Sequence, residues 1–534
     1  MAILLQGLGF SVTLVEAKDV PGGRMGRIEA LGYSFDTGPT ILQLPAILEQ
    51  IFSRVGKRLS DYVELVPVTP NTRVHFWDGT YLDTFADKEK NRAEWERFAP
   101  GSGKKSGSKR FDRFYETHEQ KYEDAYSRFI AADASSVLRY FNPFRLLPAL
   151  RYAPWRSLHA SLMSTLDDER LVYALSYPSK YLGLHPTTCS SVFSVIPFLE
   201  LAFGVHHPRG GFRALADGML RAFVDLGGTT RFGEEVKRIV TRGTDGKLVA
   251  QGVELASGER LEAEEVIVNA DWAMAASKLL PVDAARASKD PEHLRYSAST
   301  MMLYLGLDTT YPNVPHHSIY LSESVRKTDR ATLEDRRFDR DDAPFYVCNP
   351  AATDPSCAPP GHSAIYVLVP APNTANAVDW SANIANFTDH VIERLELVGM
   401  PNVREHIRFE RVFTAETWRD DFAVHRGAVF NLAHGFTQLG PLRPPSKDPG
   451  VSHLSWVGGG THPGSGLLTI FESANIAAAA IAKAHGKRLA PSIAPPVPRE
   501  PSSSVFRDVA SFGETAARRL KKAASERERR STTD

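Results

Sequence analysis

Near the start of the chain, a carboxylate, a pair of glycines and an arginine follow a short apolar run. The run VTLVEA contains Glu16 at its end, and after five intervening residues come Gly22, Gly23 and Arg24. A carboxylate at a strand end can accept hydrogen bonds from a ribose. Paired glycines let the backbone approach a ligand closely, and an arginine beside them can meet phosphate charge. A second short strand, YSF, leads into the turn DTGPT at residues 36–40. This order of features predicts an FAD site.

The elements that must position these residues are those of a parallel α/β sheet. Residues 1–9 are typical of the last turns of a helix that ends at Gly7 or Gly9, and the apolar strand follows at once. A dinucleotide fold has the order strand, glycine-rich turn, helix, strand with a terminal acid. The first strand and its G-x-G-x-x-G turn do not precede the helix here. We therefore expect a truncated chain or a misplaced start codon.

Segments later in the chain are predicted to complete the FAD site. The sequence PRGG at residues 208–211 precedes the helical pattern ALADGMLRAFVDLG, and EEVIVNAD is typical of a buried strand. Residues 454–485 combine a strand, a glycine-rich turn and a helix of small residues. Backbone N–H groups at the start of such a helix can meet an electron-rich ligand edge.

These patterns predict an α/β protein with a Rossmann-like FAD-binding domain, lacking its first strand and glycine-rich turn, and a mixed-sheet plus helical substrate domain. Residues 111–203 are predicted to be mostly helical, and residues 100–110 to form a mobile surface loop. The predicted boundaries are 1–85, 206–295 and 441–487 for the FAD-binding domain, 86–205 and 296–440 for the substrate-binding, membrane-facing domain, and 488–534 for a disordered basic tail.

Composition narrows the class of protein. The 63 Lys and Arg residues balance the 63 Asp and Glu residues, so net charge does not suggest a nucleic-acid partner. The three cysteines, Cys189, Cys348 and Cys357, lack metal-ligand spacing and are too few for a disulfide framework. We expect indifferent thiols in a reduced cytoplasmic setting and no metal site. No stretch has the apolar length of a membrane span, and the start lacks the basic flank of a signal peptide.

Residues 140–155, YFNPFRLLPALRYAPW, suggest contact with a membrane surface. They mix aromatic residues and leucines with arginines, which suits apolar rings below the lipid headgroups and arginines at their level. The alternative is a core helix broken by prolines. We expect a cytoplasmic protein that is peripherally membrane-associated.

The quoted motifs carry a family resemblance. E-x5-GGR-x-G, the GPT turn, PRGG before a helix, and VGGGTHPGSG before a small-residue helix resemble the bacterial and fungal type of phytoene desaturase. That group lies within a wider family of two-domain flavoproteins with amine oxidases, carotenoid isomerases and retinol saturase. The resemblance runs from Phe10 to about Ala484. It implies removal of hydrogen from a C40 polyene held in a long apolar cavity, with hydride passing to FAD and oxygen or a quinone reoxidising the flavin.

The resemblance also implies cofactor contacts. Glu16 binds the adenosine ribose, and Val236 presents its backbone to the adenine, although a core valine is the alternative. The other members approach the pyrophosphate, the isoalloxazine ring or the ribityl chain: Gly22, Gly23, Arg24, Gly38, Pro39, Thr40, Gly459, Gly466, Leu467 and Leu468.

Some residue must take the proton that leaves with the hydride. Candidates are Asp168, Glu169 and Arg170 in the DDER segment and Arg209 in PRGG; water is another. Each of these residues could instead form a surface ion pair, and either arginine could instead contact a phosphate. Two rival functions stay open: a related isomerase, ketolase or later-step desaturase, and a flavin-less lipid-binding protein of the same fold. The sequence has no second Rossmann fingerprint to support an NAD(P) site.

Overall fold

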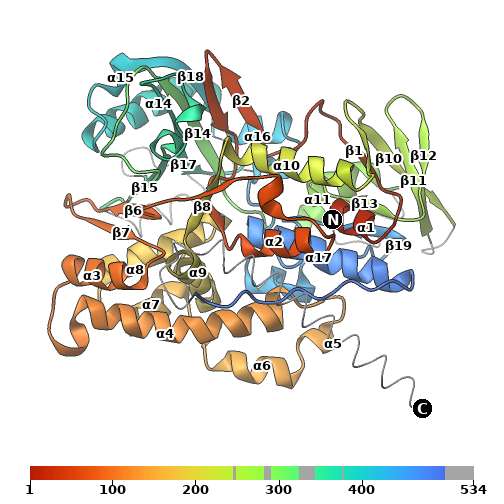
Figure 1. Cartoon of the computed structure of the whole chain (residues 1–534), viewed down its shortest axis with the longest axis horizontal. Coiled ribbons are helices and arrows are strands. Elements are labelled where there is room, and N and C mark those ends of the chain that lie inside the picture. The colour runs from red at the N-terminus through yellow and green to blue at the C-terminus, as the bar shows by residue number, and fades with distance from the viewer. Residues whose placement is uncertain (244–247, 282–289, 324–342, 376–377, 499–534) are drawn as a thin grey trace.

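The structure, a computed structural model, describes residues 1–243, 248–281, 290–323, 343–375 and 378–498. Figure 1 shows a sheet with helix α14 (Trp380–Leu397) at the upper left, a group of short strands at the right, and a layer of helices from α3 to α9 below. Segments from distant parts of the chain meet in each region. The α/β class expected from the sequence is confirmed.

The largest sheet has seven strands in the order β18-β14-β17-β16-β15-β6-β7. Its neighbours are antiparallel except for β15 and β6, which run parallel. In sheet order the strands are β18 (Ile407–Phe413), β14 (Ser299–Leu307), β17 (Ser363–Ala371), β16 (Phe345–Cys348), β15 (His317–Tyr320), β6 (Thr72–His75) and β7 (Tyr81–Thr84).

Alternate residues of this sheet face two different cores. On β14, Met301 and Leu303 pack in the cluster that includes Trp380 and Ile392 of α14. Met302 belongs to a second cluster, shared with the helices of the lower layer. Side chains alternate between faces with a period of two, so one strand serves both cores. This explains why every residue of β14 is buried.

The sheet also changes a predicted domain boundary. Strands β6 and β7 lie before residue 85, within the segment assigned from the sequence to the FAD-binding domain. In the structure, β6 pairs in parallel with β15, with Ser318 opposite Arg73 and Tyr320 opposite His75. Residues 72–84 therefore complete the substrate-domain sheet. A short alternating strand carries no local signal that identifies its distant partner.

The other half of the molecule contains two parallel strand pairs. β1 (Thr13–Val15) pairs with β9 (Thr229–Arg231), and β13 (Val266–Val268) pairs with β20 (Leu454–Trp456). The apolar run VTLVEA is typical of a buried strand, but all of β1 borders a large cavity and Thr13 is exposed. β13 borders the same cavity. One strand of each pair thus lines this cavity.

Helices α1 (Ala2–Gly7), α2 (Ala46–Ser53) and α17 (Leu467–Ala484) pack against one another in this half of the molecule. Among the described residues, α17 is the one helix long and apolar enough to span a membrane. However, Ala478 and Ile481 of α17 are buried in the same core cluster as α1 and α2. A core helix passes the same test of length and composition, and α17 has the packing of a core helix.

The predicted helical region is confirmed, and it starts earlier than predicted. Within the expected mobile loop at 100–110, α4 already begins at Gly107. Ser106 caps this helix, and a Cβ on Gly107 would lie 1.8 Å from the Trp95 carbonyl oxygen, so only glycine fits this close contact. The helices are α3 (Lys88–Phe98), α4 (Gly107–Ala125), α5 (Val137–Tyr140), α6 (Pro143–Leu150), α7 (Leu158–Leu166), α8 (Glu169–Ser176), the 3-10 helix η4 (Tyr177–Leu182) and α9 (Val195–Phe203).

The first part of the predicted disordered tail is bound to the globular part. The Ile493 backbone N–H donates to Gln50 of α2, and the Tyr122 hydroxyl of α4 donates to the Pro495 carbonyl at 2.9 Å. Residues 488–498 therefore join α2 to the helical layer. The remainder of the predicted tail, 499–534, lies outside the described residues.

Asp36, in the DTGPT segment, caps the helix that follows PRGG. It ends β3 (Tyr33–Asp36), and its Oδ1 accepts hydrogen bonds from the backbone N–H of Phe212 at 2.7 Å and of Arg213 at 3.4 Å. These N–H groups open α10 (Gly211–Asp225). Burial raises the pKa of Asp36 to about 6, while the backbone donors oppose the shift. Two motifs far apart in the sequence are thus joined by one carboxylate.

Gly211→Ala should destabilise the protein more than the same change in an open turn. Gly211 has φ +83°, and an added Cβ would lie 2.6 Å from Asp36 Oδ1. Gly258 has φ +89° with no atom within 4 Å of a Cβ, so Gly258→Ala is a matched control. A left-handed backbone costs either alanine about 1–2 kcal/mol. We expect a further loss of about 1–3 kcal/mol for Gly211→Ala, because Asp36 must move and break its bonds. Urea denaturation of both variants measures their free energies of unfolding. Equal losses of stability in the two variants would contradict the prediction.

Candidate functional site

One large cavity connects the two halves of the protein. Its volume is about 2030 Å³, roughly twice the upper end of the about 300–1,000 Å³ range for sites that hold one drug-sized ligand. Residues of β1, β13 and α17 line it on one side, and residues of β16, β17, η4 and α9 on the other. The cavity has room for two large ligands in contact with each other.

All of the cofactor contacts implied by the family resemblance line this cavity. They are Glu16, Gly22, Gly23, Arg24, Gly38, Pro39, Thr40, Val236, Gly459, Gly466, Leu467 and Leu468. They come from four separate parts of the chain, and the fold brings them to one cavity. Their lining position is a finding of the structure, whereas the contact of each with a cofactor stays a prediction.

Glu16 and Val236 are joined through the end of the β1–β9 pair. The Glu16 backbone N–H donates to the Arg231 carbonyl at 2.9 Å, and the Glu234 N–H donates to the Glu16 carbonyl at 3.0 Å. Val236 then begins β10 (Val236–Arg242). The Glu16 carboxylate accepts the Lys18 N–H at 2.9 Å, and Glu16 borders the cavity. The two residues can therefore contact the same end of a ligand.

The glycine pair forms a tight turn at the cavity wall. Gly22 has φ +110°, and an added Cβ would lie 2.6 Å from the Met25 carbonyl oxygen. Gly23 has φ +55° and no atom within 4 Å of a Cβ position. Gly22 is thus required by the turn itself, while Gly23 leaves open space where a ligand can approach the backbone.

Arg24 belongs to a polar cluster on the cavity wall. In the amide orientation that satisfies both neighbours, Asn431 donates to Asp271 Oδ2 at 2.8 Å and accepts from Arg24 Nη2 at 3.3 Å. Burial lowers the pKa of Arg24, and the nearby Asp271 carboxylate opposes that shift. Sequence reasoning gave no role to Asp271 or Asn431, although Asp271 ends the quoted segment EEVIVNAD.

Tyrosines of the seven-stranded sheet hold the DTGPT turn in place. The Tyr304 hydroxyl donates to the Thr37 carbonyl at 2.7 Å, and the Tyr366 hydroxyl donates to the Gly38 carbonyl at 3.0 Å. The Tyr346 hydroxyl lies 2.8 Å from Thr40 Oγ1. Burial raises the pKa of each tyrosine well above 10, so all three remain protonated. Sequence reasoning missed them because their partners lie more than 260 residues away.

A buried arginine anchors the glycine-rich turn that precedes α17. Arg443 donates to the carbonyls of Leu432, Ala433, Gln438, Gly459 and Thr461 at distances from 2.7 to 3.3 Å. Burial lowers its pKa to about 9. Backbone carbonyls surround its charge and fix the loop. No side chain caps the N-terminus of α17. Its first turn borders the cavity, so a ligand there would not compete with a capping side chain for the helix N–H groups.

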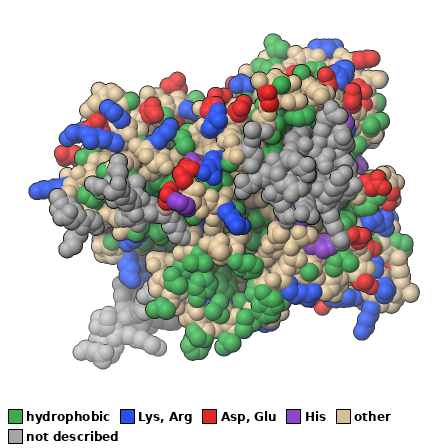
Figure 2. Space-filling model, turned by 180° about the vertical axis from the view of Figure 1, so that it is seen from behind, with side chains coloured by type: hydrophobic (Ala, Val, Ile, Leu, Met, Phe, Trp, Pro, Cys, Tyr) green, Lys and Arg blue, Asp and Glu red, His purple; other side chains and the backbone are tan. Residues whose placement is uncertain are grey.

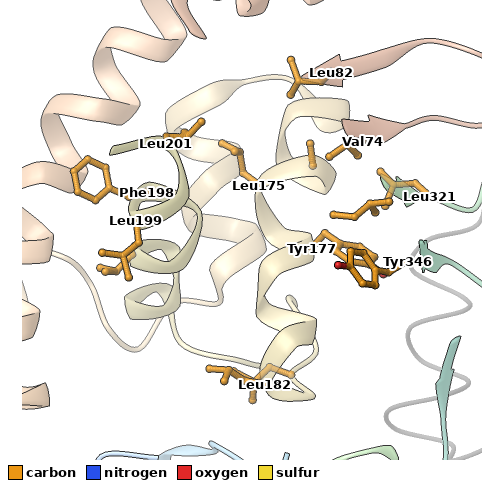
Figure 3. Close-up of a cluster of buried hydrophobic side chains, with 14 of the residues drawn as sticks. Val74, Leu82, Leu175, Tyr177, Leu182, Phe198, Leu199, Leu201, Leu321 and Tyr346 are labelled. Carbon is orange, nitrogen blue, oxygen red and sulfur yellow. The ribbon is translucent and has the colours of Figure 1, made fainter. Parts of the chain in front are cut away.

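The other arm of the cavity is apolar. Figure 3 shows part of the cluster that supplies it: Tyr177 of η4 lies beside Tyr346 of the sheet, and the side chains of α9 lie on the other side of the α8–η4 segment. Leu182 and Leu199 from the helices and Tyr346 from β16 also line the cavity. Leu368 and Pro370 of β17 continue the wall. This arm suits a long apolar ligand held by contact area.

The structure does not bring the predicted proton acceptors to the cavity. Asp168 is the N-cap of α8 and accepts a backbone N–H at 3.1 Å. Arg170 pairs with Asp78 at 3.4 Å, and Arg209 pairs with Glu64 at 2.8 Å. None of these candidates lines the cavity. Their charges serve a helix cap and surface ion pairs, which corrects the expectation of a direct catalytic role.

Glu169 likewise points elsewhere, because its carboxylate accepts the hydroxyl of Tyr173 at 2.6 Å one turn along α8. The DDER segment as a whole therefore has a structural explanation.

Comparisons with known proteins agree with this geometry. Residues 1–482 match the family described as flavin containing amine oxidoreductase. All-trans-zeta-carotene desaturase of Myxococcus xanthus is 54% identical over 94% of this chain and 95% of that protein. The zeta-carotene-forming phytoene desaturase of the same organism is 34% identical over 92% of this chain and 94% of that protein.

Solved structures show the same fold. An oxidoreductase from Methanosarcina mazei superposes with a TM-score of 0.57, at 18% identity, over 90% of this chain and 96% of that one. Putrescine oxidase bound to putrescine gives a TM-score of 0.56 at 12% identity, over 91% of this chain and 96% of that one. At these identities the likeness concerns the fold alone.

Arg24→Met should weaken flavin binding, whereas Arg209→Met should not. A hydrogen bond to a charged group contributes about 1.5–3 kcal/mol, so its loss corresponds to about 10–100-fold weaker binding. Arg209 is a matched control because it is an exposed arginine outside the cavity. Flavin absorbance of the purified variants and a flavin titration measure the effect. Equal flavin affinity in both variants would contradict the role given to Arg24.

Proposed function

The chain belongs to the flavin-containing amine oxidoreductase family, and on that premise we propose that it is an FAD-dependent desaturase of a carotenoid-type C40 polyene. The observation that supports this most strongly is the cavity of about 2030 Å³, which has polar groups suited to a dinucleotide in one arm and an apolar wall in the other. The 54% identical relative is a zeta-carotene desaturase.

The residues present fit a flavin dinucleotide. The absence of a Cβ at Gly23 leaves open space at the cavity wall, which any other side chain would partly fill. Arg24 presents a cation beside that space. The uncapped first turn of α17 adds the positive end of a helix dipole to the same cavity. Glu16 lines the same cavity, and we infer that its carboxylate accepts hydrogen bonds from a ribose. We infer that FAD, rather than a smaller flavin, occupies this arm.

A bound flavin would supply the oxidant by taking up a hydride, and water would take the proton lost from the neighbouring carbon. The protein's own residues bind, orient and exclude water. A hydrocarbon substrate offers no hydrogen bonds, so its binding depends on buried apolar area at about 25 cal/mol per Å². Leu182, Leu199 and Leu368 supply such area. The tyrosines behind the DTGPT turn keep that turn fixed against the ligands.

We further propose that the substrate is a partly desaturated carotene of the zeta-carotene class. Among the two Myxococcus xanthus relatives, identity is 54% with the zeta-carotene desaturase and 34% with the phytoene desaturase that forms zeta-carotene. The later step is thus favoured over the earlier one. An isomerase or ketolase on the same fold is the alternative.

Expression in cells that accumulate zeta-carotene should yield more extensively conjugated products. Each added double bond in conjugation shifts absorption to longer wavelength, so liquid chromatography with absorption spectra identifies them. Cells that accumulate only phytoene serve as the comparison and should show less conversion. Conversion of phytoene but not zeta-carotene would reverse the proposed step. No desaturated product from either would contradict the function, and purified protein without flavin absorbance would favour the flavin-less lipid-binding alternative.

We also propose that the protein rests on the cytoplasmic face of a membrane, where it can reach an apolar substrate. A quinone in that membrane is one candidate electron acceptor for the flavin, and oxygen is the other. Helix α6 contains no buried residue, and Leu138, Phe144 and Leu147 in α5 and α6 are 65–87% exposed. Hydrophobic side chains gather at the lower edge of the molecule in Figure 2, the end where Figure 1 places α5 and α6. Exposed Arg151 and Arg156 lie beside them in sequence and suit anionic headgroups.

Replacing Leu138 and Phe144 by serine should weaken binding to lipid vesicles. Burial of one such side chain contributes about 1.5–3 kcal/mol, so partitioning should fall at least about tenfold. Leu397→Ser is a matched control because Leu397 is 85% exposed at the end of α14, away from this surface. Co-sedimentation with vesicles that contain anionic lipid measures the bound fraction. The proposal fails if Leu397→Ser reduces binding as much as the double variant.

A further inference from the structure

Two histidines and a cysteine meet behind the cavity wall, on strands β15 and β16. His317 begins β15 and Cys348 ends β16, and the two are directly paired across these antiparallel strands. His316 immediately precedes β15. One ligand atom from each of the three lies within 4.8 Å of the others. All three side chains are at least 98% buried.

The two imidazoles are held in a defined orientation. His316 Nδ1 lies 2.8 Å from Thr353 Oγ1, and His317 Nδ1 lies 2.6 Å from the Tyr346 hydroxyl. The Nε2 atom of each ring is buried and has no hydrogen-bond partner. An unsatisfied buried polar atom costs about 1–3 kcal/mol, so two side by side require an explanation.

The surroundings favour neutral rings and a protonated thiol when no metal is bound. Burial holds the pKa of His316 well below 6.5 and lowers that of His317 to about 3. Burial likewise raises the pKa of the Cys348 thiol. A neutral imidazole whose Nδ1 donates a hydrogen bond presents a lone pair at Nε2, which is the arrangement found in histidine metal ligands.

We propose that His316, His317 and Cys348 form a binding site for a zinc ion. Imidazole and thiolate ligands select zinc-class metals over Mg²⁺ or Ca²⁺. Metal–ligand bonds of about 2.0–2.3 Å place tetrahedral ligand atoms about 3.3–3.8 Å apart, so atoms that now lie within 4.8 Å of one another must move closer when the ion binds. Binding converts the Cys348 thiol to thiolate, and the released proton passes to solvent.

A small void borders the cysteine of the cluster. Its volume is about 10 Å³, close to the space one water needs, and it is lined by Cys348, His207 and Asp36 but by neither His316 nor His317. The His207 ring centroid is 4.9 Å from that of His316. A tetrahedral zinc site with three protein ligands takes a water as its fourth ligand.

The site would stabilise the cavity wall and take no part in the redox chemistry. Tyr346, which bonds both His317 and Thr40, lines the cavity from the same strand as Cys348. A metal would thus tie β15 and β16 together behind the DTGPT turn. This role is independent of the substrate and of the desaturase activity.

Metal analysis of the purified full chain tests the proposal. After incubation with Zn²⁺ and dialysis against metal-free buffer, we expect one retained equivalent by mass spectrometry and a higher melting temperature. Incubation with Co²⁺ alone should give thiolate charge-transfer bands and tetrahedral d–d bands in a difference spectrum. Wild-type protein that retains no zinc and gives no cobalt bands would overturn the proposal, whatever the behaviour of variants.

Variants then locate the site. Cys348→Ser and His317→Gln should abolish zinc retention and the cobalt spectrum. Cys357→Ser, a neighbouring cysteine outside the cluster, should leave both unchanged. Thr353→Val removes the Nδ1 partner of His316 and should weaken zinc binding about 10–100-fold. Retention of zinc by folded Cys348→Ser would overturn the assignment.

Discussion

The turn at residues 36–40 is the constraint on which the rest of the structure depends. Its carbonyls and Thr40 are bonded by three buried tyrosines of the seven-stranded sheet, while Asp36 caps α10 from the opposite side. Both sets of bonds are shielded from water, where a lost partner leaves a costly unsatisfied group. The turn therefore fixes the sheet, α10 and the cavity wall relative to one another. Residues 37–40 line the cavity together with Tyr346 and Tyr366 of the sheet.

That position explains the division of the cavity. A dinucleotide needs cations, acceptors and open backbone, and these come from the ends of short parallel strands, from Arg24 and from the start of α17. A polyene needs only apolar area, which a sheet buried on both faces and the helices η4 and α9 supply. Because the hydrocarbon has no polar group to hold, its position against the flavin must come from the shape of this wall. A rigid wall is consequently part of the chemistry.

Most of the buried polar groups named around the cavity wall have hydrogen-bond partners. Arg443 is satisfied by backbone carbonyls, and the three tyrosines are satisfied by the turn. The paired histidines behind Tyr346 are only half satisfied, because their Nε2 atoms have no partner. A zinc ion at that point would satisfy them and would strengthen the wall from behind. The same surface of β16 would then serve the turn through Tyr346 and the metal through Cys348.

The sequence alone determined the class of fold and the family, because paired glycines, a strand-end acid and a glycine-rich turn before a helix impose local backbone geometry. It also predicted the cofactor contacts, and all of these residues line the cavity. It misplaced the boundary at residue 85 and the roles of Asp168, Arg170 and Arg209, since helix capping and ion pairing use the same residue types as proton transfer. The tertiary structure alone decided that β6 pairs with β15, that Asn431 links Arg24 to Asp271, and that His317 lies opposite Cys348. The residues in each of these pairs are separated by tens to hundreds of positions. Only the long-range packing of strands brings them into contact, and no local pattern records it.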